Sequence, residues 1–198
     1  AVDRAESEKD IAFQVNGEAV GVMAAVCKQF ATKLIHISTD YVFDGKASQP
    51  YKESDAVNPQ SVYGTSKLEG ERQALLYNPE TLIIRTSWVY SEYGKNFVKT
   101  MLKLMAEKDV IQVVNDQFGS PTYAANLATV ILHIIGSYKW EPGIYHYSNE
   151  GVISWFDFAT EIAKYTGSKC TVNLILTSAY PTPAKRPGWS VFDHQKIM

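Results

Sequence analysis

The sequence has little of what marks a secreted, membrane or nucleic-acid-binding protein. It has two cysteines, Cys27 and Cys170, which is too few for a disulfide framework, and we expect both thiols to be reduced. Its most apolar run, LATVILHIIG, is too short to span a bilayer, and its first residues, AVDRAESEKD, are too polar for a signal peptide. The 19 Lys and Arg residues stand against 21 Asp and Glu residues and form no cluster. We therefore expect a cytoplasmic protein that binds a small molecule, and neither nucleic acid nor a membrane.

The residues that are present have the balance of a globular protein, with 45% hydrophobic and 20% charged. Apolar residues recur at helical spacing in some segments and form short β-rich runs in others. Helices are expected over residues 10–31, 62–77, 96–107, 124–135 and 154–167. Strands are expected over 33–39, 81–90, 110–116 and 143–149, loops over 43–61 and 117–123, and an irregular tail over 181–196. This alternation predicts an α/β fold with a mostly parallel sheet.

The stretch YGTSK places Tyr63 four residues before Lys67, near the start of an expected helix. Residues four apart share a helix face, so the Lys67 ammonium can favour the phenolate and make the phenol a usable acid near neutral pH. The spacing alone is a weak signal, because the chain has 12 tyrosines and repeats it in YTGSK. There Gly167 is expected to end the helix between Tyr165 and Lys169, so we interpret the second pair as chance.

A polar run, Ser38, Thr39, Asp40 and Tyr41, lies at the C-terminal end of the strand expected before the first long loop. In open α/β sheets, ligands bind at the carboxyl ends of the strands. The hydroxyl of Thr39 and the phenol of Tyr63 can therefore converge on one oxygen atom of a ligand. This context distinguishes the first Tyr-x-x-x-Lys pair from the second.

Five stretches carry a family resemblance: STDYVFDG, YKESDAVNPQSVYGTSKLEGE, LIIRTSWVY, VVNDQFGSPTY and AKRPGWSVFD. Together they resemble the dTDP-4-dehydrorhamnose reductases, which are extended short-chain dehydrogenase/reductases. The similarity covers nearly all of the chain. It implies the C-terminal part of a Rossmann-type parallel sheet with helices, plus a small α/β substrate-binding subdomain. The first part is expected over residues 1–92 and the nucleotide-sugar-binding part over 93–198, with one strand near 143–149 returning to the main sheet.

The resemblance also implies roles for individual residues. Tyr63 would protonate the C4 oxygen as hydride arrives, Lys67 would lower the phenol pKa and hold the nicotinamide ribose, and Thr39 would bind the reacting oxygen. The expected cofactor contacts are Ser38, Tyr63, Lys67, Ser87, Trp88 and Val89. The expected substrate contacts are Thr39, Asp40, Tyr41, Trp88, Asn96, Asp116, Gln117, Gly119, Pro121, Thr122, Arg186 and Ser190. Asn16 matches the helix asparagine of related enzymes only loosely.

Three of these residues have ordinary structural alternatives. An aspartate at a strand end, such as Asp40, is as often a turn or cap residue. Trp88 could equally be a core residue. Arg186 could hold a pyrophosphate through bidentate hydrogen bonds, but a lone arginine is usually solvated.

One feature of the resemblance is missing, because no Gly-x-x-Gly-x-x-Gly or Gly-x-Gly-x-x-Gly motif occurs. The nearest candidate, NGEAVG, lies inside a helical pattern, whereas a dinucleotide-binding turn follows a strand. We therefore expect the larger C-terminal part of a reductase, inactive by itself, whose cofactor in the full-length protein is NADPH or NADH. No metal-ligating residues are assigned, although a divalent ion such as magnesium is considered, and a homodimer is considered as well.

Two other functions compete with this interpretation. A nucleotide-sugar 4-epimerase or dehydratase of the same superfamily would use the same tyrosine and lysine, but STDYVFDG and NDQFGSPT speak against it. A non-catalytic subunit resembling the regulatory proteins of methionine adenosyltransferase would share the fold. Intact Thr39, Tyr63 and Lys67 do not exclude that subunit.

Overall fold

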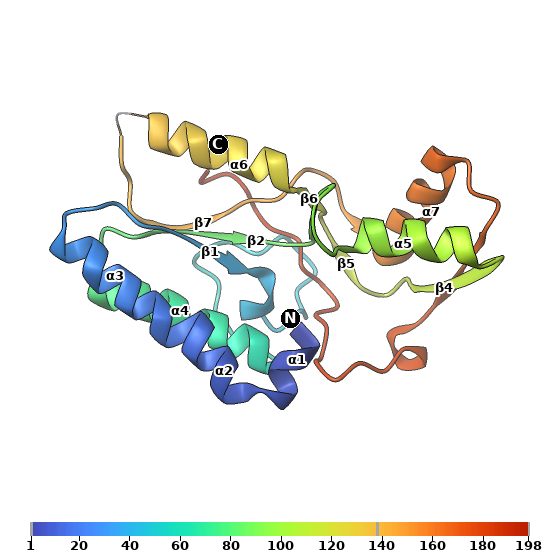
Figure 1. Cartoon of the computed structure of the whole chain (residues 1–198), viewed down its shortest axis with the longest axis horizontal. Coiled ribbons are helices and arrows are strands. Elements are labelled where there is room, and N and C mark those ends of the chain that lie inside the picture. Colours follow the sequence, from blue (N-terminus) through green and yellow to red (C-terminus); the bar gives the residue numbers. More distant parts are fainter. Residues whose placement is uncertain (1, 138, 198) are drawn as a thin grey trace.

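The computed structural model describes residues 2–137 and 139–197, and it has the α/β organisation that the sequence predicts (Figure 1). The helices are α1 Val2–Ser7, α2 Lys9–Phe13, α3 Ala19–Gln29, α4 Val62–Tyr77, α5 Phe97–Glu107, α6 Ala124–Gly136 and α7 Trp155–Thr166. The strands are β1 Ile35–Thr39, β2 Leu82–Thr86, β3 Val89–Tyr90, β4 Val110–Val114, β5 Phe118–Gly119, β6 Thr122–Tyr123, β7 Gly143–His146, β8 Ile153–Ser154 and β9 Thr171–Ile175. Short helical turns lie at Gln14–Glu18, Asp40–Val42 and Thr177–Ala179.

The main sheet has the strand order β1-β2-β7, and both pairings are parallel. Helices α3 and α4 lie on one face of this sheet and α6 on the other (Figure 1). Strand β2 is buried along its whole length, and its side chains alternate between the two faces. Leu82 and Ile84 pack in a core with Leu127 of α6, whereas Ile83 packs with Val20 of α3 and Ala74 of α4. Burial on both faces explains the continuous apolar run LII.

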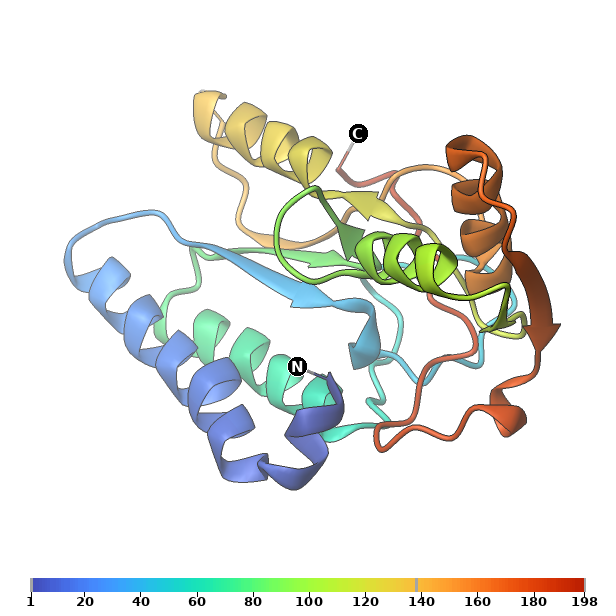
Figure 2. The same cartoon turned by 45° about the vertical axis from the view of Figure 1, so that its right-hand side comes forward.

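A second hydrophobic core lies around the parallel pair β4–β9, where α5 and α7 pack together (Figure 2). Its buried members are Met101, Met105, Ile111, Val113, Ala159, Ile162 and Cys170. The short strands of the pairs β3–β6 and β5–β8 stand, in sequence, between segments of the first core and segments of the second. Strand β7 pairs with β2 and not with β4. A boundary near residue 92 between two functional regions stays a prediction.

Several helix ends follow the expected sequence signals. Ser61 caps α4, since its Oγ accepts a hydrogen bond from the Gly64 amide at 3.1 Å. Ser154 caps α7 in a capping box, and Gly167 ends that helix in a left-handed conformation with φ 66°. Gly167 therefore separates Tyr165 from Lys169, as expected.

The helix expected over 10–31 contains one irregularity. Between α2 and α3 the segment Gln14–Glu18 forms a π-helical turn, which widens the helix by one residue per turn. This turn brings the Asn16 carbonyl oxygen against α4, so closely that a Cβ atom at Gly70 would collide with it. The two helices can approach this closely only because position 70 lacks a side chain.

Other expectations were incomplete. The strand expected over 81–90 is interrupted, because Trp88 has φ 49° and β3 pairs with β6 in a separate sheet. The loop expected over 117–123 contains β5 and β6. Helix α1 and strands β8 and β9 were not predicted. Strand β9 is largely exposed, and the polar–apolar alternation in its sequence TVNLI extends over only four residues, which is a short signal for a strand.

Candidate active site

The residues Thr39, Asp40 and Tyr41 lie where β1 ends and the turn Asp40–Val42 begins. The Thr39 hydroxyl donates to the Asp40 carboxylate at 2.9 Å and accepts from the Tyr41 amide at 3.2 Å. Thr39 and Asp40 are both buried. The strand end thus presents hydroxyl and carboxyl groups that are fixed to one another, at the edge of the sheet where the sequence predicted a ligand site.

Tyr63 stands in the first turn of α4 and faces this strand end. Its ring contacts the ring of Tyr41 edge-on, with centroids 5.5 Å apart. A Cβ atom at Gly64 would collide with the Tyr41 carbonyl oxygen, so glycine lets the start of α4 approach the backbone of the Asp40–Val42 turn. Glu6 of α1 also accepts from the Val62 amide at 2.8 Å. Of the predicted catalytic residues the structure therefore brings Thr39 and Tyr63 together, and the predicted substrate contact Asp40 lies beside them.

Lys67 follows Tyr63 by one turn but directs its ammonium to β1. Its Nζ atom donates to the Ile37 carbonyl oxygen at 2.6 Å and lies 3.5 Å from Nε2 of His36. Burial lowers the pKa of Lys67, and the Glu71 carboxylate partly offsets this. Burial and then the Lys67 charge lower the pKa of His36 to about 4, so this imidazole is neutral and can accept a hydrogen bond.

The pKa of Tyr63 moves in the direction opposite to the one predicted. Burial raises it most, the charge of Asp40 raises it further, and hydrogen bonding by Thr39 opposes the rise. Lys67 is not among these causes. The physical reason is that the ammonium of Lys67 is held by the Ile37 carbonyl, so the four-residue spacing alone does not deliver its charge to the phenol.

The carboxyl group of Asp40 is buried, which is unusual for an ionisable side chain. Desolvation raises its pKa to about 6, and the hydroxyls of Ser190 and Thr39 lower it in part. Among the described residues its Oδ2 atom makes no hydrogen bond of normal geometry, and neither does Ser190 Oγ. Two neighbouring polar groups with unused hydrogen-bonding capacity in a buried place are typical of a ligand site.

Arg186 lies on the other side of Tyr41. Its guanidinium donates to the Asp3 carboxylate at 2.6 Å and to the Tyr41 hydroxyl at 3.5 Å. Arg186 is half-buried and so is not the freely solvated side chain of the ordinary alternative. Its expected contact with a pyrophosphate stays a prediction.

Trp88 stacks on Trp155 of α7, with ring centroids 3.5 Å apart and an angle of 9° between the planes. Gly119 also packs against Trp88, so closely that a Cβ atom at position 119 would come within 2.6 Å of the indole. Trp88 is half-buried. The aromatic stack and the left-handed backbone together fix the indole at the junction between the two cores.

The loop after β4 packs against the end of β2. Thr86 donates to Thr122 at 3.3 Å, and the Ser87 hydroxyl donates to the Ser120 carbonyl at 2.9 Å. Ser87 and Thr122 are fully buried, whereas Pro121 is half-buried and Val89 is exposed.

Three predicted substrate contacts are engaged in structural hydrogen bonds. Asn96 caps α5 by accepting from the Lys99 amide at 3.1 Å. Asp116 accepts from the amide and the hydroxyl of Thr177, at 2.8 and 2.7 Å, and Gln117 donates to the same hydroxyl at 3.0 Å. These contacts explain the residues without a ligand, so their substrate roles stay predictions. Asn16 likewise donates to Ser66 at 3.0 Å.

Several residues around the site were not predicted: Asp3, His36, Glu71, Arg85 and Trp155. Only Glu71 had a local signal, since it follows Lys67 by four residues on the same helix. The others come from distant segments and carry no motif of their own.

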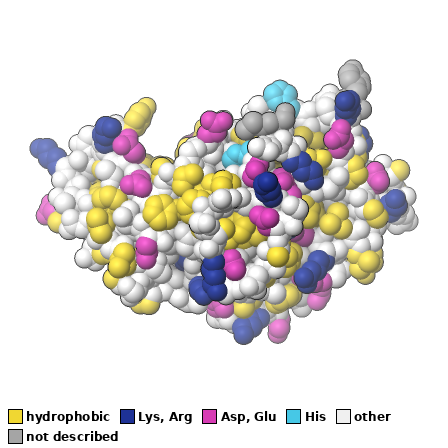
Figure 3. Space-filling view, turned by 180° about the vertical axis from the view of Figure 1, so that it is seen from behind, with side chains coloured by type: hydrophobic (Ala, Val, Ile, Leu, Met, Phe, Trp, Pro, Cys, Tyr) yellow, Lys and Arg dark blue, Asp and Glu magenta, His cyan; other side chains and the backbone are white. Residues whose placement is uncertain are grey.

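The rest of the described chain offers little that competes with this site. Two surface hollows of about 390 and 250 Å³ lie near the C-terminal tail, and neither is lined by Tyr63, Thr39 or Lys67. On the face seen in Figure 3, cationic and anionic side chains are intermixed. Within residues 2–137 and 139–197, no group of three or more His, Cys, Asp or Glu side chains is placed to hold a metal ion, so magnesium has no support here. In the same residues no helix is long and apolar enough to cross a membrane.

The α/β fold with its parallel sheet, which solved dTDP-4-dehydrorhamnose reductases share, defines an oxidoreductase of the short-chain dehydrogenase/reductase class. The family model described as the RmlD substrate binding domain matches residues 1–198, and the chain belongs to this family. A dTDP-4-dehydrorhamnose reductase of Aggregatibacter actinomycetemcomitans is 44% identical over 207 residues, which cover 100% of this chain and 70% of the relative. The spore coat polysaccharide biosynthesis protein SpsK of Bacillus subtilis is 43% identical over 197 residues, or 69% of its length.

A solved structure is equally similar. The dTDP-4-dehydrorhamnose reductase of Bacillus anthracis, in complex with NADP, superposes with a TM-score of 0.96 at 41% identity. The match covers 100% of this chain and 69% of that one.

Proposed function

We propose that this chain carries the catalytic and sugar-binding residues of a dTDP-4-dehydrorhamnose reductase, which reduces the 4-keto group of dTDP-4-dehydro-6-deoxy-L-mannose to give dTDP-L-rhamnose. The observation that carries the proposal is the convergence of Thr39, Asp40 and Tyr63 at the carboxyl end of β1. The named relatives act in the same chemistry or in polysaccharide biosynthesis. We place the chain in dTDP-rhamnose formation on this combined basis.

The chain's own residues would handle the proton. A nicotinamide cofactor supplies hydride to C4, which leaves negative charge on the C4 oxygen. A tyrosine phenol is neutral at pH 7, and the raised pKa of Tyr63 favours this form further, so its proton is available for that oxygen. The Thr39 hydroxyl is fixed by Asp40 and Tyr41, so it is oriented before substrate arrives.

Among the expected cofactor contacts, Lys67 fits the role better than Ser38 and Ser87 do. An ammonium has three donors, and the Ile37 carbonyl and His36 take two of them, which leaves one N–H for a ribose hydroxyl. Ser38 and Ser87 are buried, and their hydroxyls already donate to Glu71 and to the Ser120 carbonyl. NADPH is the form that the NADP-bound relative favours, and NADH stays an alternative.

The sugar nucleotide would lie along Asp40, Tyr41 and Ser190 and reach Arg186. Arg186 already points one N–H toward the Tyr41 hydroxyl, and a guanidinium suits a diphosphate. We further propose that residues 93–198 mainly bind this nucleotide while residues 1–92 carry the catalytic pair. The core around β4–β9 supports this division because it is built wholly from residues 97–172, although the core around β2 also takes Leu127 and Tyr145 from the second range.

A homodimer is proposed from the exposed apolar stripe on α2 and α3. Ile11, Val15, Val22, Val26 and Phe30 recur along these helices, and Phe30 is 70% exposed. Apolar patches of this kind are typical of contact surfaces. A second copy of the chain is the partner that we propose.

A 4-epimerase remains the second candidate because it would use the same pair. Its first step requires Tyr63 to accept a proton, and a raised pKa disfavours the phenolate that would do so. Turnover of dTDP-4-dehydrorhamnose with NADPH, by a complete reductase that carries these 198 residues, tests the assignment. Stoichiometric NADPH oxidation and formation of dTDP-rhamnose are expected. In a parallel assay, conversion of a 4-hydroxy nucleotide-sugar to its C4 epimer without net cofactor oxidation would indicate the epimerase, and no turnover in either assay would favour the regulatory subunit.

A further inference from the structure

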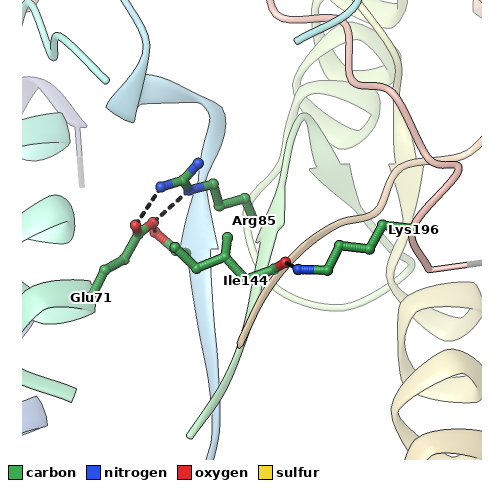
Figure 4. A network of polar contacts seen from close by, with 5 residues as sticks. Glu71, Arg85, Ile144 and Lys196 are labelled. Atoms are coloured by element: carbon green, nitrogen blue, oxygen red, sulfur yellow. Dashed lines mark hydrogen bonds and ion pairs between the residues drawn. The ribbon is translucent and has the colours of Figure 1, made fainter. Parts of the chain in front are cut away.

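Glu71 of α4 and Arg85 of β2 form a buried ion pair (Figure 4). Glu71 of α4 accepts hydrogen bonds from Nε and Nη2 of Arg85 on β2, at 2.9 and 2.7 Å, and from the Ser38 hydroxyl on β1. Both members of the pair are 2% exposed. One carboxylate therefore links a helix to two strands of the sheet.

The Glu71 carboxylate holds Ser38, a residue of β1 whose two neighbours, Ile37 and Thr39, contact Lys67 and Asp40. Ser38 lies between Ile37, whose carbonyl accepts from Lys67, and Thr39, whose hydroxyl stands beside Asp40. A shift of Ser38 along or away from α4 would move both of these groups relative to Tyr63. The register β1–β2, with Ser38 opposite Arg85, places both donors against the same acceptor.

Stability alone is a poor reason for this arrangement. A buried ion pair often contributes no more than apolar side chains of the same size, because desolvation offsets the attraction. Nη1 of Arg85 is moreover buried without a hydrogen-bond partner among the described residues. A costly pair that is retained next to catalytic groups is better explained by orientation and charge than by packing.

Glu71 also acts on the charge of Lys67, four residues earlier on the same helix. Burial lowers the pKa of Lys67, and Glu71 raises it. The titratable and charged groups described around Lys67 are Tyr63 and Glu71 on its own helix, His36 on β1 and, behind Glu71, Arg85 on β2. Glu71 is the carboxylate of this set and lies one helical turn from Lys67.

We propose that Glu71 is a positioning residue of the reductase site, which fixes Ser38 and its neighbours against α4 and supplies an anion one helical turn from Lys67. This inference rests on the proposed function. It is tested with two variants of a complete reductase that carries these residues. Glu71→Gln combined with Arg85→Gln removes both buried charges but keeps hydrogen-bonding groups. Glu71→Asp keeps the charge opposite Arg85, and because it is shorter by one methylene it cannot hold both partners.

The first readout is the pKa of Lys67 itself, followed through the Cε signal of ¹³C-lysine-labelled protein. In the double variant this pKa should fall, because the carboxylate that raises it is gone, and the alkaline limb of the kcat/KM profile should move to lower pH by the same amount. Glu69→Gln is the matched control. It removes the same charge from the same helix, at a half-buried residue that is bonded to Gln73 and does not act on Lys67.

The second readout is turnover by Glu71→Asp, in which kcat should fall roughly ten- to a hundredfold through misplacement of Thr39 and Ile37, with the Lys67 pKa unchanged. An unshifted Lys67 pKa in a folded double variant, or wild-type kcat in Glu71→Asp, overturns the proposal. If the double variant does not fold, Glu71→Asp still decides. Absence of turnover in the unmodified protein would instead refute the proposed function, and the Lys67 pKa would still test Glu71.

Discussion

Replacing Asp40 by asparagine isolates the cost of the buried carboxylate at the site. Asparagine has nearly the same shape, and its Oδ1 atom can still accept the hydrogen bond from Thr39. The folded protein raises the Asp40 pKa from 3.8 to about 6, chiefly by desolvation. Asparagine carries no charge at any pH, so the variant removes this cost and changes little else.

The sign and the size follow from proton linkage. Between pH 4 and pH 6 the unfolded chain has released the Asp40 proton while the folded protein still holds it, so stability falls as the pH rises through this window. A rise of about two units corresponds to about 3 kcal/mol once the pH is well above 6. About 2 kcal/mol of this should be lost between pH 4.5 and pH 7.5. Asp40→Asn should therefore gain stability relative to the unmodified protein by about 2 kcal/mol over that interval.

Urea unfolding of both proteins at pH 4.5, 5.5 and 7.5 measures this difference, and other carboxyl groups cancel in the comparison. Asp44→Asn is the control of opposite sign. The Lys46 amide lowers the Asp44 pKa, so the unmodified protein should lose stability relative to that variant as the pH falls. A pH-independent difference between Asp40→Asn and the unmodified protein would show that Asp40 has an ordinary pKa and would refute the reasoning.

Four further results are expected. In a complete reductase, Tyr63→Phe should lower kcat by roughly 10²- to 10⁴-fold with little change in KM. The control Tyr165→Phe, which changes a 95% exposed phenol, should leave kcat unchanged. An unaltered kcat in Tyr63→Phe removes Tyr63 from the mechanism. Gly70→Ala should destabilise the fold by about 2 kcal/mol or more in denaturant unfolding, while Gly136→Ala, which meets open space, should not. Val22→Glu should convert a dimer into a monomer by light scattering, and an unchanged mass would move the interface elsewhere. Calorimetric titration of NADPH into the 198-residue chain should show no saturable binding, and tight stoichiometric binding would contradict the interpretation of the missing glycine motif.

Much of the fold could be predicted because local signals and tertiary packing agree in it. Helix α4 begins and ends where the sequence places it, since Ser61 supplies the cap. The buried strand β2 is visible as an apolar run because both of its faces are covered. Strand β9 has no cap and no apolar run, and its polar–apolar alternation is only four residues long. It is an exposed strand of five residues, and its pairing with β4 is fixed by tertiary contacts that no local pattern encodes.

The residues of the site likewise fall into those that a local pattern predicts and those that only tertiary contacts fix. The meeting of Tyr63 with Thr39 follows from topology, since a parallel strand ends where the next helix begins. The partners of Arg186 and Asp116 could not be predicted in this way. Asp3 lies 183 residues before Arg186 and Thr177 lies 61 residues after Asp116, and a sequence pattern of a few residues cannot encode such contacts.

The acidity of Tyr63 shows why spacing was an insufficient guide. A lysine four residues along a helix can reach the phenol, but it can also reach the strand beneath, and here the Ile37 carbonyl and the neutral His36 hold its ammonium. Burial and Asp40 then determine the phenol pKa, and both raise it. Because Asp40 itself changes charge near pH 6, its ionisation makes Tyr63 a weaker acid as the pH rises through that value. Burial and the Asp40 carboxylate therefore both favour the neutral phenol of Tyr63, which is the form that can donate a proton when negative charge develops on a neighbouring oxygen.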